Sequence, residues 1–124
     1  MQKILIIDDS PVARKILKSC IPKDEPMELF EEGDGISGLQ RFETIYPDIT
    51  ITDLTMPEMN GMEVLEKIKK SYPDAIVIVS SADVQPITKE RVMSLGAFAF
   101  LKKPPSKEAV AKLFADLAQY RKQK

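Results

Sequence analysis

Short apolar runs and longer amphipathic stretches alternate along the whole chain. The apolar runs have the length and composition of buried strands, and they cover residues 3–7, 27–30, 49–52, 75–80 and 97–101. Between and after them, apolar residues recur at helical spacing, most clearly at Ala13, Ile16, Leu17 and Cys20, and again at Val110, Leu113, Phe114, Leu117 and Tyr120. The pattern therefore predicts strands and helices in strict alternation.

Two of the predicted helices begin with a capping signal. Ser10 followed by Pro11 is typical of an N-cap with proline at the first helical position, and Asp34 is a second candidate cap. The weaker helices are indicated by Leu39, Phe42 and Tyr46, by Leu65, Ile68 and Tyr72, and by Val92 with Leu95. The last of these, the fourth helix, has the faintest pattern.

Alternating strands and helices predict a parallel sheet. The nearly unbroken apolar runs at 4–7 and 75–79 fit strands that helices cover on both faces. We therefore expect an α/β fold, a doubly wound (βα)5 three-layer sandwich, as a single domain over residues 1–124 with no output domain. A (βα) barrel would need about 250 residues, and no GxGxxG or P-loop pattern follows the first run.

Composition narrows the chemistry. The chain has no histidine and one cysteine, Cys20, which excludes Ser-His-Asp catalysis, histidine-ligated metals and zinc sites made of several cysteines. Any metal must then be held by oxygen atoms. No apolar run approaches the roughly 20 residues of a membrane span, and no signal peptide is evident. We expect a cytoplasmic protein with no membrane partner.

Charge is divided unevenly between the two halves of the chain. Residues 1–63 hold 13 acidic and 6 basic side chains, whereas residues 64–124 hold 6 acidic and 12 basic ones. This division fits a cation site in the first half and an anionic partner for the second, although a dipolar solvated surface would give the same counts. Nucleic acid is not expected, because the basic residues are not interleaved with aromatics and the pI is about 5.5.

Polar side chains stand where the predicted strands end. Asp8 and Asp9 come after the first run, Asp53 after the third, Ser81 after the fourth and Lys103 after the fifth. Ligands of a doubly wound sheet bind at the carboxyl ends of its strands, so we expect these side chains to gather there. Three carboxylates in one place either take up protons or bind a cation. With oxygen ligands alone, Mg²⁺ is the expected metal.

Such a site suits a phosphoryl group. The cation and Lys103 balance charge on the phosphoryl oxygens while a carboxylate attacks in line. Asp53 is the expected nucleophile, because Asp8 and Asp9 are adjacent and better suited to metal binding.

These residues also carry a family resemblance. Asp8-Asp9 followed by Ser10-Pro11, the segment from Asp53 to Gly61, Ser81-Ala82 and Lys103-Pro104 occur in order. Together they resemble the receiver domain of bacterial response regulators, especially the single-domain CheY-like type, over essentially the whole chain. The resemblance implies a flavodoxin-like fold with a parallel five-stranded sheet of order 2-1-3-4-5.

The resemblance also implies residue roles. Asp53 would accept a phosphoryl group from the phosphohistidine of a partner histidine kinase or phosphotransfer protein. Asp9, Asp53 and the Thr55 backbone carbonyl would bind Mg²⁺, or Mn²⁺ in its place, with Asp8 acting through water. Lys103 and Ser81 would contact the phosphoryl oxygens, and Phe100 would be an aromatic switch working with Ser81. By this resemblance the protein is no enzyme beyond its own phosphorylation and autodephosphorylation.

Some positions depart from the commonest pattern of the family or vary within it. Ser81 stands where threonine is frequent, and it keeps the hydroxyl. Phe100 lacks the hydroxyl of a tyrosine, so no output can depend on that group. Thr55 and Asp83 occupy the positions at which the family tunes the lifetime of the phosphorylated state. Pro105 stands where an aromatic residue is more usual.

The family uses its fourth helix, fifth strand and fifth helix as an output face. Here that face would span about 86–120, and it would carry Lys89, Arg91, Phe100, Lys102, Lys107 and Lys112. Its basic character favours an acidic surface on an unidentified downstream protein. A lysine-rich face that is only solvated would show the same residues. Receivers dimerise through this face, so both a monomer and a weak dimer fit. The single-domain format suggests chemotaxis or a phosphorelay.

Two other functions remain open. A pseudo-receiver would bind partners without phosphorylation, and the intact acidic pair, acceptor and lysine argue against it. A small phosphatase forming an aspartyl-phosphate would use a similar acid, hydroxyl and lysine. That reading is weakened because Thr55, not an acid, stands two residues after Asp53, and because the chain has no insertion for substrate specificity.

Overall fold

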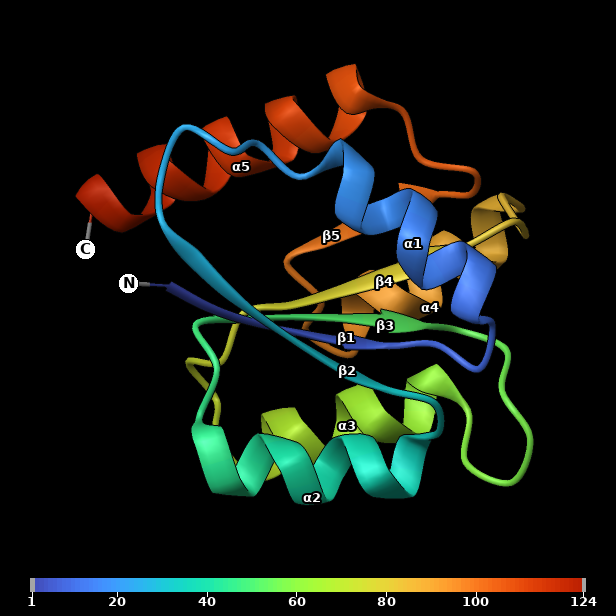
Figure 1. Cartoon of the computed structure of the whole chain (residues 1–124). Helices are drawn as coiled ribbons and strands as arrows, with labels where there is room; N and C mark the ends of the chain where they lie inside the picture. The colour runs from blue at the N-terminus through green and yellow to red at the C-terminus, as the bar shows by residue number, and fades with distance from the viewer. Residues whose placement is uncertain (1, 124) are drawn as a thin grey trace.

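Strands and helices alternate along the chain in the computed structural model, which describes residues 2–123 (Figure 1). The strands are β1 (Gln2–Ile7), β2 (Met27–Glu32), β3 (Ile49–Asp53), β4 (Val77–Ser81) and β5 (Ala99–Lys102). The helices are α1 (Pro11–Cys20), α2 (Gly35–Ile45), α3 (Gly61–Ser71), α4 (Pro86–Ser94) and α5 (Lys107–Lys122). The alternation expected from the hydrophobic pattern is confirmed, including the faint fourth helix.

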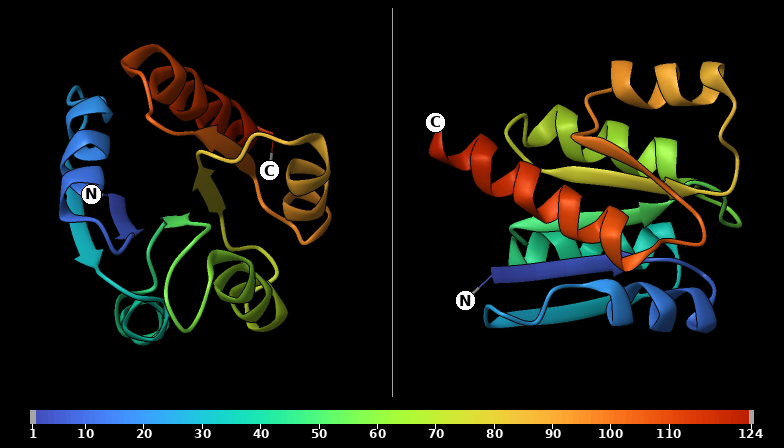
Figure 2. Two further views of the ribbon diagram at one scale, coloured as in Figure 1. Left: turned by 90° about the vertical axis from the view of Figure 1, so that its right-hand side faces the viewer. Right: turned by 90° about the horizontal axis from the view of Figure 1, so that it is seen from above.

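The strands form one parallel sheet of order β2-β1-β3-β4-β5, as expected. Strand order reverses at β1, because the chain first moves outward to β2 and then returns past β1 to β3. The left view of Figure 2 looks onto the carboxyl ends of the strands, around which the βα loops lie. A crevice for ligands is expected at this edge, next to the reversal.

A separate hydrophobic core lies on each face of the sheet. Because side chains alternate along a strand, Ile4 and Ile6 of β1 pack against α1 and α5, whereas Leu5 and Ile7 pack against α2, α3 and α4. All four of these side chains are fully buried. The three-layer sandwich is thereby confirmed. No helix among residues 2–123 has the length and apolarity needed to cross a bilayer.

Four helices begin with a side chain that bonds a free backbone N–H. Ser10 accepts from the Ala13 nitrogen and Asp34 from the Ser37 nitrogen, so both predicted caps are confirmed. Asn60 and Glu63 form a capping box at α3, and Ser106 caps α5. In contrast, α4 has no side-chain bond from its N-cap residue, Gln85.

The fourth and fifth strands start two residues later than their apolar runs. Residues 75–76 and 97–98 are apolar because they pack against the two cores at the strand entrances. Backbone bonds from Thr50 N to Ile76 O (3.0 Å) and from Phe98 N to Val77 O (2.8 Å) join these entrances to the sheet. At these two places the hydrophobic pattern therefore indicates buried residues, and it overestimates the length of the regular strand.

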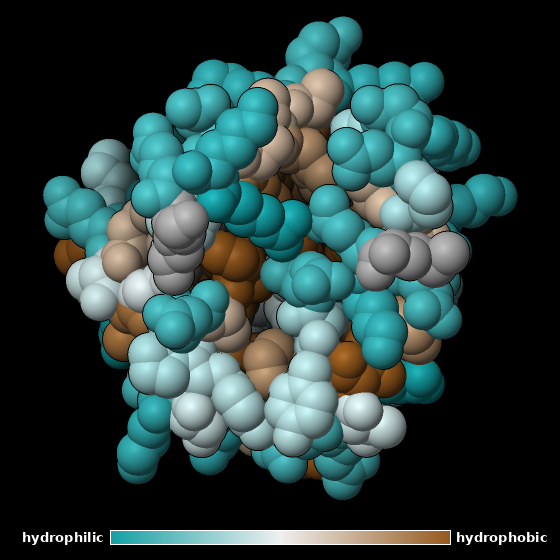
Figure 3. Space-filling view, turned by 90° about the vertical axis from the view of Figure 1, so that its left-hand side faces the viewer, coloured by the Kyte–Doolittle hydropathy of each residue, from teal (hydrophilic) through white to brown (hydrophobic). Residues whose placement is uncertain are grey.

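Figure 3 shows the opposite end of the molecule, where the strands begin. Hydrophilic side chains surround a hollow that exposes apolar residues. Met27 and Ile49 from the strand starts line a pocket at this end, together with Phe114 and Leu117 of α5. The acids and the lysine singled out from the sequence lie at the other end of the sheet.

Candidate functional site

Three carboxylates gather at the carboxyl ends of β1 and β3. Asp8 directly follows β1 and Asp53 is the last residue of β3, so the pairing of these neighbouring strands brings the two acids together. Asp8, Asp9 and Asp53 each offer a carboxylate oxygen, and these oxygens lie within 4.8 Å of one another. Asp8 and Asp53 are buried, whereas Asp9 is exposed. The site therefore has two acids on its floor and one on its solvent side.

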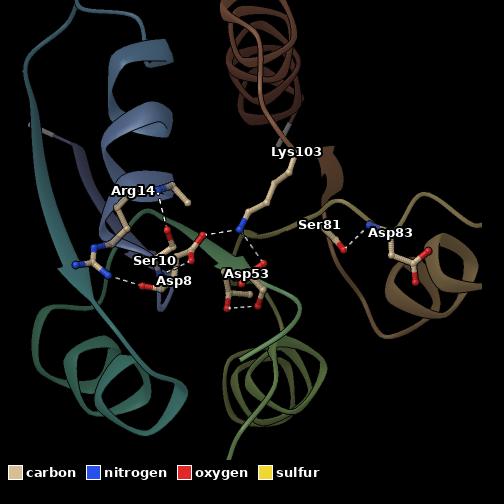
Figure 4. Close-up of polar contacts among 9 residues, drawn as sticks. Asp8, Ser10, Arg14, Asp53, Ser81, Asp83 and Lys103 are labelled. Atoms are coloured by element: carbon tan, nitrogen blue, oxygen red, sulfur yellow. Dashed lines mark hydrogen bonds and ion pairs between the residues drawn. The ribbon is translucent and has the colours of Figure 1, made fainter. Parts of the chain in front are cut away.

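Lys103 joins the two buried acids. Its Nζ lies 2.7 Å from Asp8 Oδ2 and 3.0 Å from Asp53 Oδ1 (Figure 4). The Lys103 backbone nitrogen donates to the Ser81 carbonyl at 2.9 Å, which continues the β4–β5 pairing and fixes where the side chain starts. Burial works against the ammonium charge, but the hydrogen bonds and charges of Asp8 and Asp53 outweigh it and raise the pKa of Lys103. The positive charge of Lys103 is therefore favoured by its position between the two acids.

The pKa of Asp53 is raised above its usual value. Burial is the main cause, and the negative charges of Asp8 and Asp9 act in the same direction, while the hydrogen bond from Lys103 opposes them. The carboxylate lies beside a cavity that is lined mostly by apolar residues such as Ile6, Leu17 and Ile51. The negative charge of Asp53 is thus only partly compensated by Lys103.

This donor set fits a hard divalent cation. Carboxylate oxygens are the ligands that Mg²⁺ and Ca²⁺ prefer, and three of them converge here beside a single ammonium group. The exposed position of Asp9 leaves one side open to water or to a phosphate oxygen. The acidic pocket could therefore bind a metal ion.

The loop after β3 folds back closely beneath Asp53. The Gly61 nitrogen donates to the Leu54 carbonyl at 2.8 Å, which closes the loop from 54 to 60. A Cβ atom on Gly61 would lie 2.1 Å from the Asp53 carbonyl oxygen, so only glycine allows this approach. Thr55 lies exposed in the same loop.

Ser81 is buried at the end of β4, but its hydroxyl does not turn toward the carboxylates. Its Oγ accepts a hydrogen bond from the Asp83 nitrogen at 3.0 Å, and Figure 4 shows it directed away from Asp53. Asp83 itself is exposed in the β4–α4 loop. Of the five candidate polar residues, four therefore form one cluster, and Ser81 stands beside it.

The remaining candidates lie on α4, β5 and α5. Phe100 is half-buried on β5, with the Lys89 ammonium 5.6 Å from the centre of its ring. The other basic residues expected on the output face, Arg91, Lys102, Lys107 and Lys112, are all exposed. They lie on the three elements of the expected output face, where Lys112 also pairs with Asp116 at 3.0 Å.

Arg14 also supports the site, and the sequence did not single it out. Its guanidinium donates to the backbone carbonyl of Asp8, and its Nε lies 2.9 Å from Glu31 Oε1. Lys18, one turn further along α1, pairs with the other Glu31 oxygen at 2.7 Å. The two cations lower the pKa of Glu31. Only the i, i+4 spacing of Arg14 and Lys18 hints at this shared partner in the sequence.

The comparisons with known proteins agree with the fold and the site. The model of the response regulator receiver domain family matches residues 4–115. The chemotaxis protein CheY of Listeria monocytogenes is 36% identical over 105 residues, which cover 84% of this chain and 87% of that protein. The crystal structure of chemotaxis protein CheY4 of Vibrio cholerae superposes with a TM-score of 0.83 at 25% identity, covering 94% of this chain and 98% of that one.

Longer proteins match as well. A protein-glutamate methylesterase/protein-glutamine glutaminase of Koribacter versatilis is 36% identical over 104 residues, 82% of this chain. The chain spans only 29% of the length of that relative. The doubly wound sheet, with its acidic pocket and a lysine at the carboxyl edge, agrees with the receiver domain family that these comparisons identify. The chain belongs to the response regulator receiver family and is of the CheY-like type.

Proposed function

We propose that the protein is a phosphorylation-dependent signalling switch with Asp53 as the phosphoryl acceptor. One observation carries the proposal: the buried Asp53 carboxylate lies within 4.8 Å of two further carboxylates and 3.0 Å from the Lys103 ammonium. A structural acid would gain nothing from two acidic neighbours, whereas a phosphoryl acceptor needs a cation site and a positive side chain beside it.

The reaction is an in-line transfer. An Asp53 oxygen forms a bond to the phosphorus of a phosphohistidine on a histidine kinase or phosphotransfer protein, while the P–N bond breaks and its electron pair returns to the imidazole nitrogen. The product is an acyl phosphate. The phosphorylated state ends by hydrolysis. Water attacks the phosphorus, the Asp53 carboxylate leaves, and inorganic phosphate is released, which restores the resting protein.

The cation would be held by Asp9, Asp53 and the Thr55 carbonyl, with Asp8 acting through water. Mg²⁺ is the expected ion, and Mn²⁺ prefers the same oxygen ligands. A bound divalent ion would neutralise charge on the phosphoryl oxygens. Lys103 already lies between Asp8 and Asp53, so it contacts a phosphoryl oxygen after a small movement of its side chain.

Phosphorylation adds roughly two negative charges at a buried position. The Ser81 hydroxyl would turn from Asp83 to donate to a phosphoryl oxygen, and Phe100 would take the space vacated by the β4–α4 loop. The face made by α4, β5 and α5 then changes shape. Thr55, two residues after the acceptor, and Asp83, two residues after Ser81, would tune how easily water reaches the acyl phosphate.

The partner of that face is a protein with an acidic surface, because the face presents Lys89, Arg91, Lys102, Lys107 and Lys112. The likeness to CheY proteins supports a role in chemotaxis or in a phosphorelay. Kinase and switch would meet in the cytoplasm.

Intact-mass measurement after incubation with Mg²⁺ and acetyl phosphate tests the proposal. We expect a single phosphoryl adduct that Asp53→Asn abolishes. Asp24→Asn, a change to an exposed acid in the α1–β2 loop, serves as the matched control and should keep the adduct. If no adduct forms and beryllofluoride does not bind either, the proposal is wrong and a phosphorylation-independent scaffold is favoured.

A further inference from the structure

The first turn of α4 is held by the residues that surround Ser81. Asp83 Oδ2 accepts a hydrogen bond from the Thr88 hydroxyl at 2.9 Å, and Asp83 Oδ1 accepts from the Gln85 nitrogen at 3.0 Å. The backbone nitrogen of the same Asp83 donates to the Ser81 hydroxyl oxygen at 3.0 Å. Asp83 therefore connects Ser81 to α4 through both its main chain and its side chain.

The connection joins a helix that lacks an ordinary side-chain cap. Gln85 occupies the N-cap position of α4 without a side-chain cap bond, and Pro86 follows it. The start of α4 is thus fixed by a residue outside the helix, two positions after Ser81. The bond from the Thr88 hydroxyl to Asp83 therefore links the first turn of α4 to the loop that precedes it.

A second contact ties the same turn to the other switch residue. Lys89 follows Thr88 directly, and its ammonium lies over the Phe100 ring at 5.6 Å. In the first turn of α4, Thr88 is therefore connected to Ser81 through Asp83, and the next residue, Lys89, contacts Phe100.

We propose that Asp83 and Thr88 are positioning residues that hold the Ser81 hydroxyl away from Asp53, and that Lys89 holds Phe100 in its resting position from the same helical turn. The inference rests on the proposed function. When Ser81 turns toward a phosphoryl group, it gives up the Asp83 nitrogen and the loop moves. The Asp83–Thr88 bond then breaks, and the first turn of α4 is freed together with Phe100.

The contacts therefore oppose activation. Each stabilises the resting state, and a phosphoryl group binds with an apparent affinity reduced by the cost of breaking them. Loss of one contact should make activation easier without touching the acids or Lys103.

Beryllofluoride titration in the presence of Mg²⁺ tests the Thr88 contact. Thr88→Val removes the hydroxyl and keeps the shape of the side chain, so beryllofluoride should bind about two- to fivefold more tightly, the range expected for one partly exposed hydrogen bond. Thr88→Ser keeps a hydroxyl and should return the affinity toward that of the wild type. Thr44→Val is the matched control, because the Thr44 hydroxyl bonds only within α2, to the Gln40 carbonyl.

A double-mutant cycle separates positioning from a general loosening of α4. In the Ser81→Ala background no hydroxyl is left to be held, so Thr88→Val should no longer change the affinity. An equal gain with and without Ser81, or no gain in Thr88→Val, would overturn the inference.

The Lys89 contact is tested by Lys89→Met, with the exposed Lys67→Met of α3 as control. Removing a positive charge weakens the binding of an anion in general. The contact is therefore supported if Lys89→Met binds beryllofluoride more tightly than the wild type and Lys67→Met does not. Weaker binding by both variants would overturn it. A wild-type protein that neither binds beryllofluoride nor forms a phosphoryl adduct would overturn the proposed function itself. If the wild type binds beryllofluoride and the variants bind it equally well, only the present inference fails.

Discussion

Asp53 carries its charge at a position where burial and two acidic neighbours disfavour it. Its raised pKa means that the folded protein binds a proton at this group more readily than the unfolded chain does. Above both pKa values the ionised carboxylate therefore costs stability, and the cost disappears at a pH low enough to protonate Asp53 in both states. Lys103 reduces this cost but does not remove it.

Asp53→Asn should therefore stabilise the metal-free protein at neutral pH. The asparagine removes the unfavourable charge, and Lys103 keeps its bond to Asp8. We expect a gain on the order of 1 kcal/mol in the free energy of unfolding, measured by urea titration in the presence of EDTA. The gain should shrink as the pH falls toward the usual pKa of aspartate. Asp24→Asn should leave the stability nearly unchanged, and a clear loss of stability in Asp53→Asn would contradict this account of the site.

Among the elements, the start of α3 is the one most tightly constrained by the site. Its capping box at Asn60 and the close approach of Gly61 to the Asp53 carbonyl place the helix directly beneath the acceptor. Packing of α3 and the position of Asp53 are therefore not independent. The β3–α3 loop transmits any shift of the helix to the end of β3.

Gly61→Ala should destabilise the protein by about 2 kcal/mol or more, because the new methyl group overlaps backbone atoms of residues 53 and 54. Gly33→Ala is the matched control. A Cβ atom there would meet only the end of the Arg14 side chain at 3.7 Å. Denaturant unfolding of both variants checks this, and similar stabilities for the two would show that the loop is looser than described.

Across the whole molecule, the acids of the first half meet Lys103 of the second at a single edge of the sheet. The net charge of −1 conceals this arrangement. Lys103 directly follows β5 and contacts Asp53, so charge added at Asp53 lies next to one element of the proposed output face.

Mg²⁺ should raise the thermal midpoint of the wild-type protein in a concentration-dependent way. Only the folded chain brings the three carboxylates together, and a ligand that binds the folded state alone stabilises it. A shift of several degrees is expected at saturating Mg²⁺, measured by differential scanning calorimetry. Asp9→Asn should reduce the shift. An unchanged midpoint in the wild type would remove the cation site from the account.

Much of the fold and the position of the site follow from sequence pattern alone. Parallel strands end at one edge, so residues such as Asp8 and Asp53 must converge once the alternation is recognised. The gathering of Asp8, Asp9, Asp53 and Lys103 could be predicted for this reason, although Asp53 and Lys103 are far apart in the sequence.

Other features depend on geometry that the sequence does not display. The pairing of Arg14 with Glu31 requires the position of α1 over β2, which no local pattern specifies. The direction of the Ser81 hydroxyl and the bond from Thr88 to Asp83 are matters of rotamer and loop path. The capping box of Asn60 and Glu63 is a different case, because the spacing of these two residues is itself a signal of a helix start in the sequence.

Reductive trapping of the phosphorylated residue tests the central claim most directly. Borohydride converts an aspartyl phosphate to homoserine, and peptide mass mapping then locates the changed residue. After treatment with Mg²⁺ and acetyl phosphate, the account predicts homoserine at position 53 and nowhere else. Reduction at Asp8 or Asp9, or no reduced residue in a protein that carries a phosphoryl adduct, would contradict it.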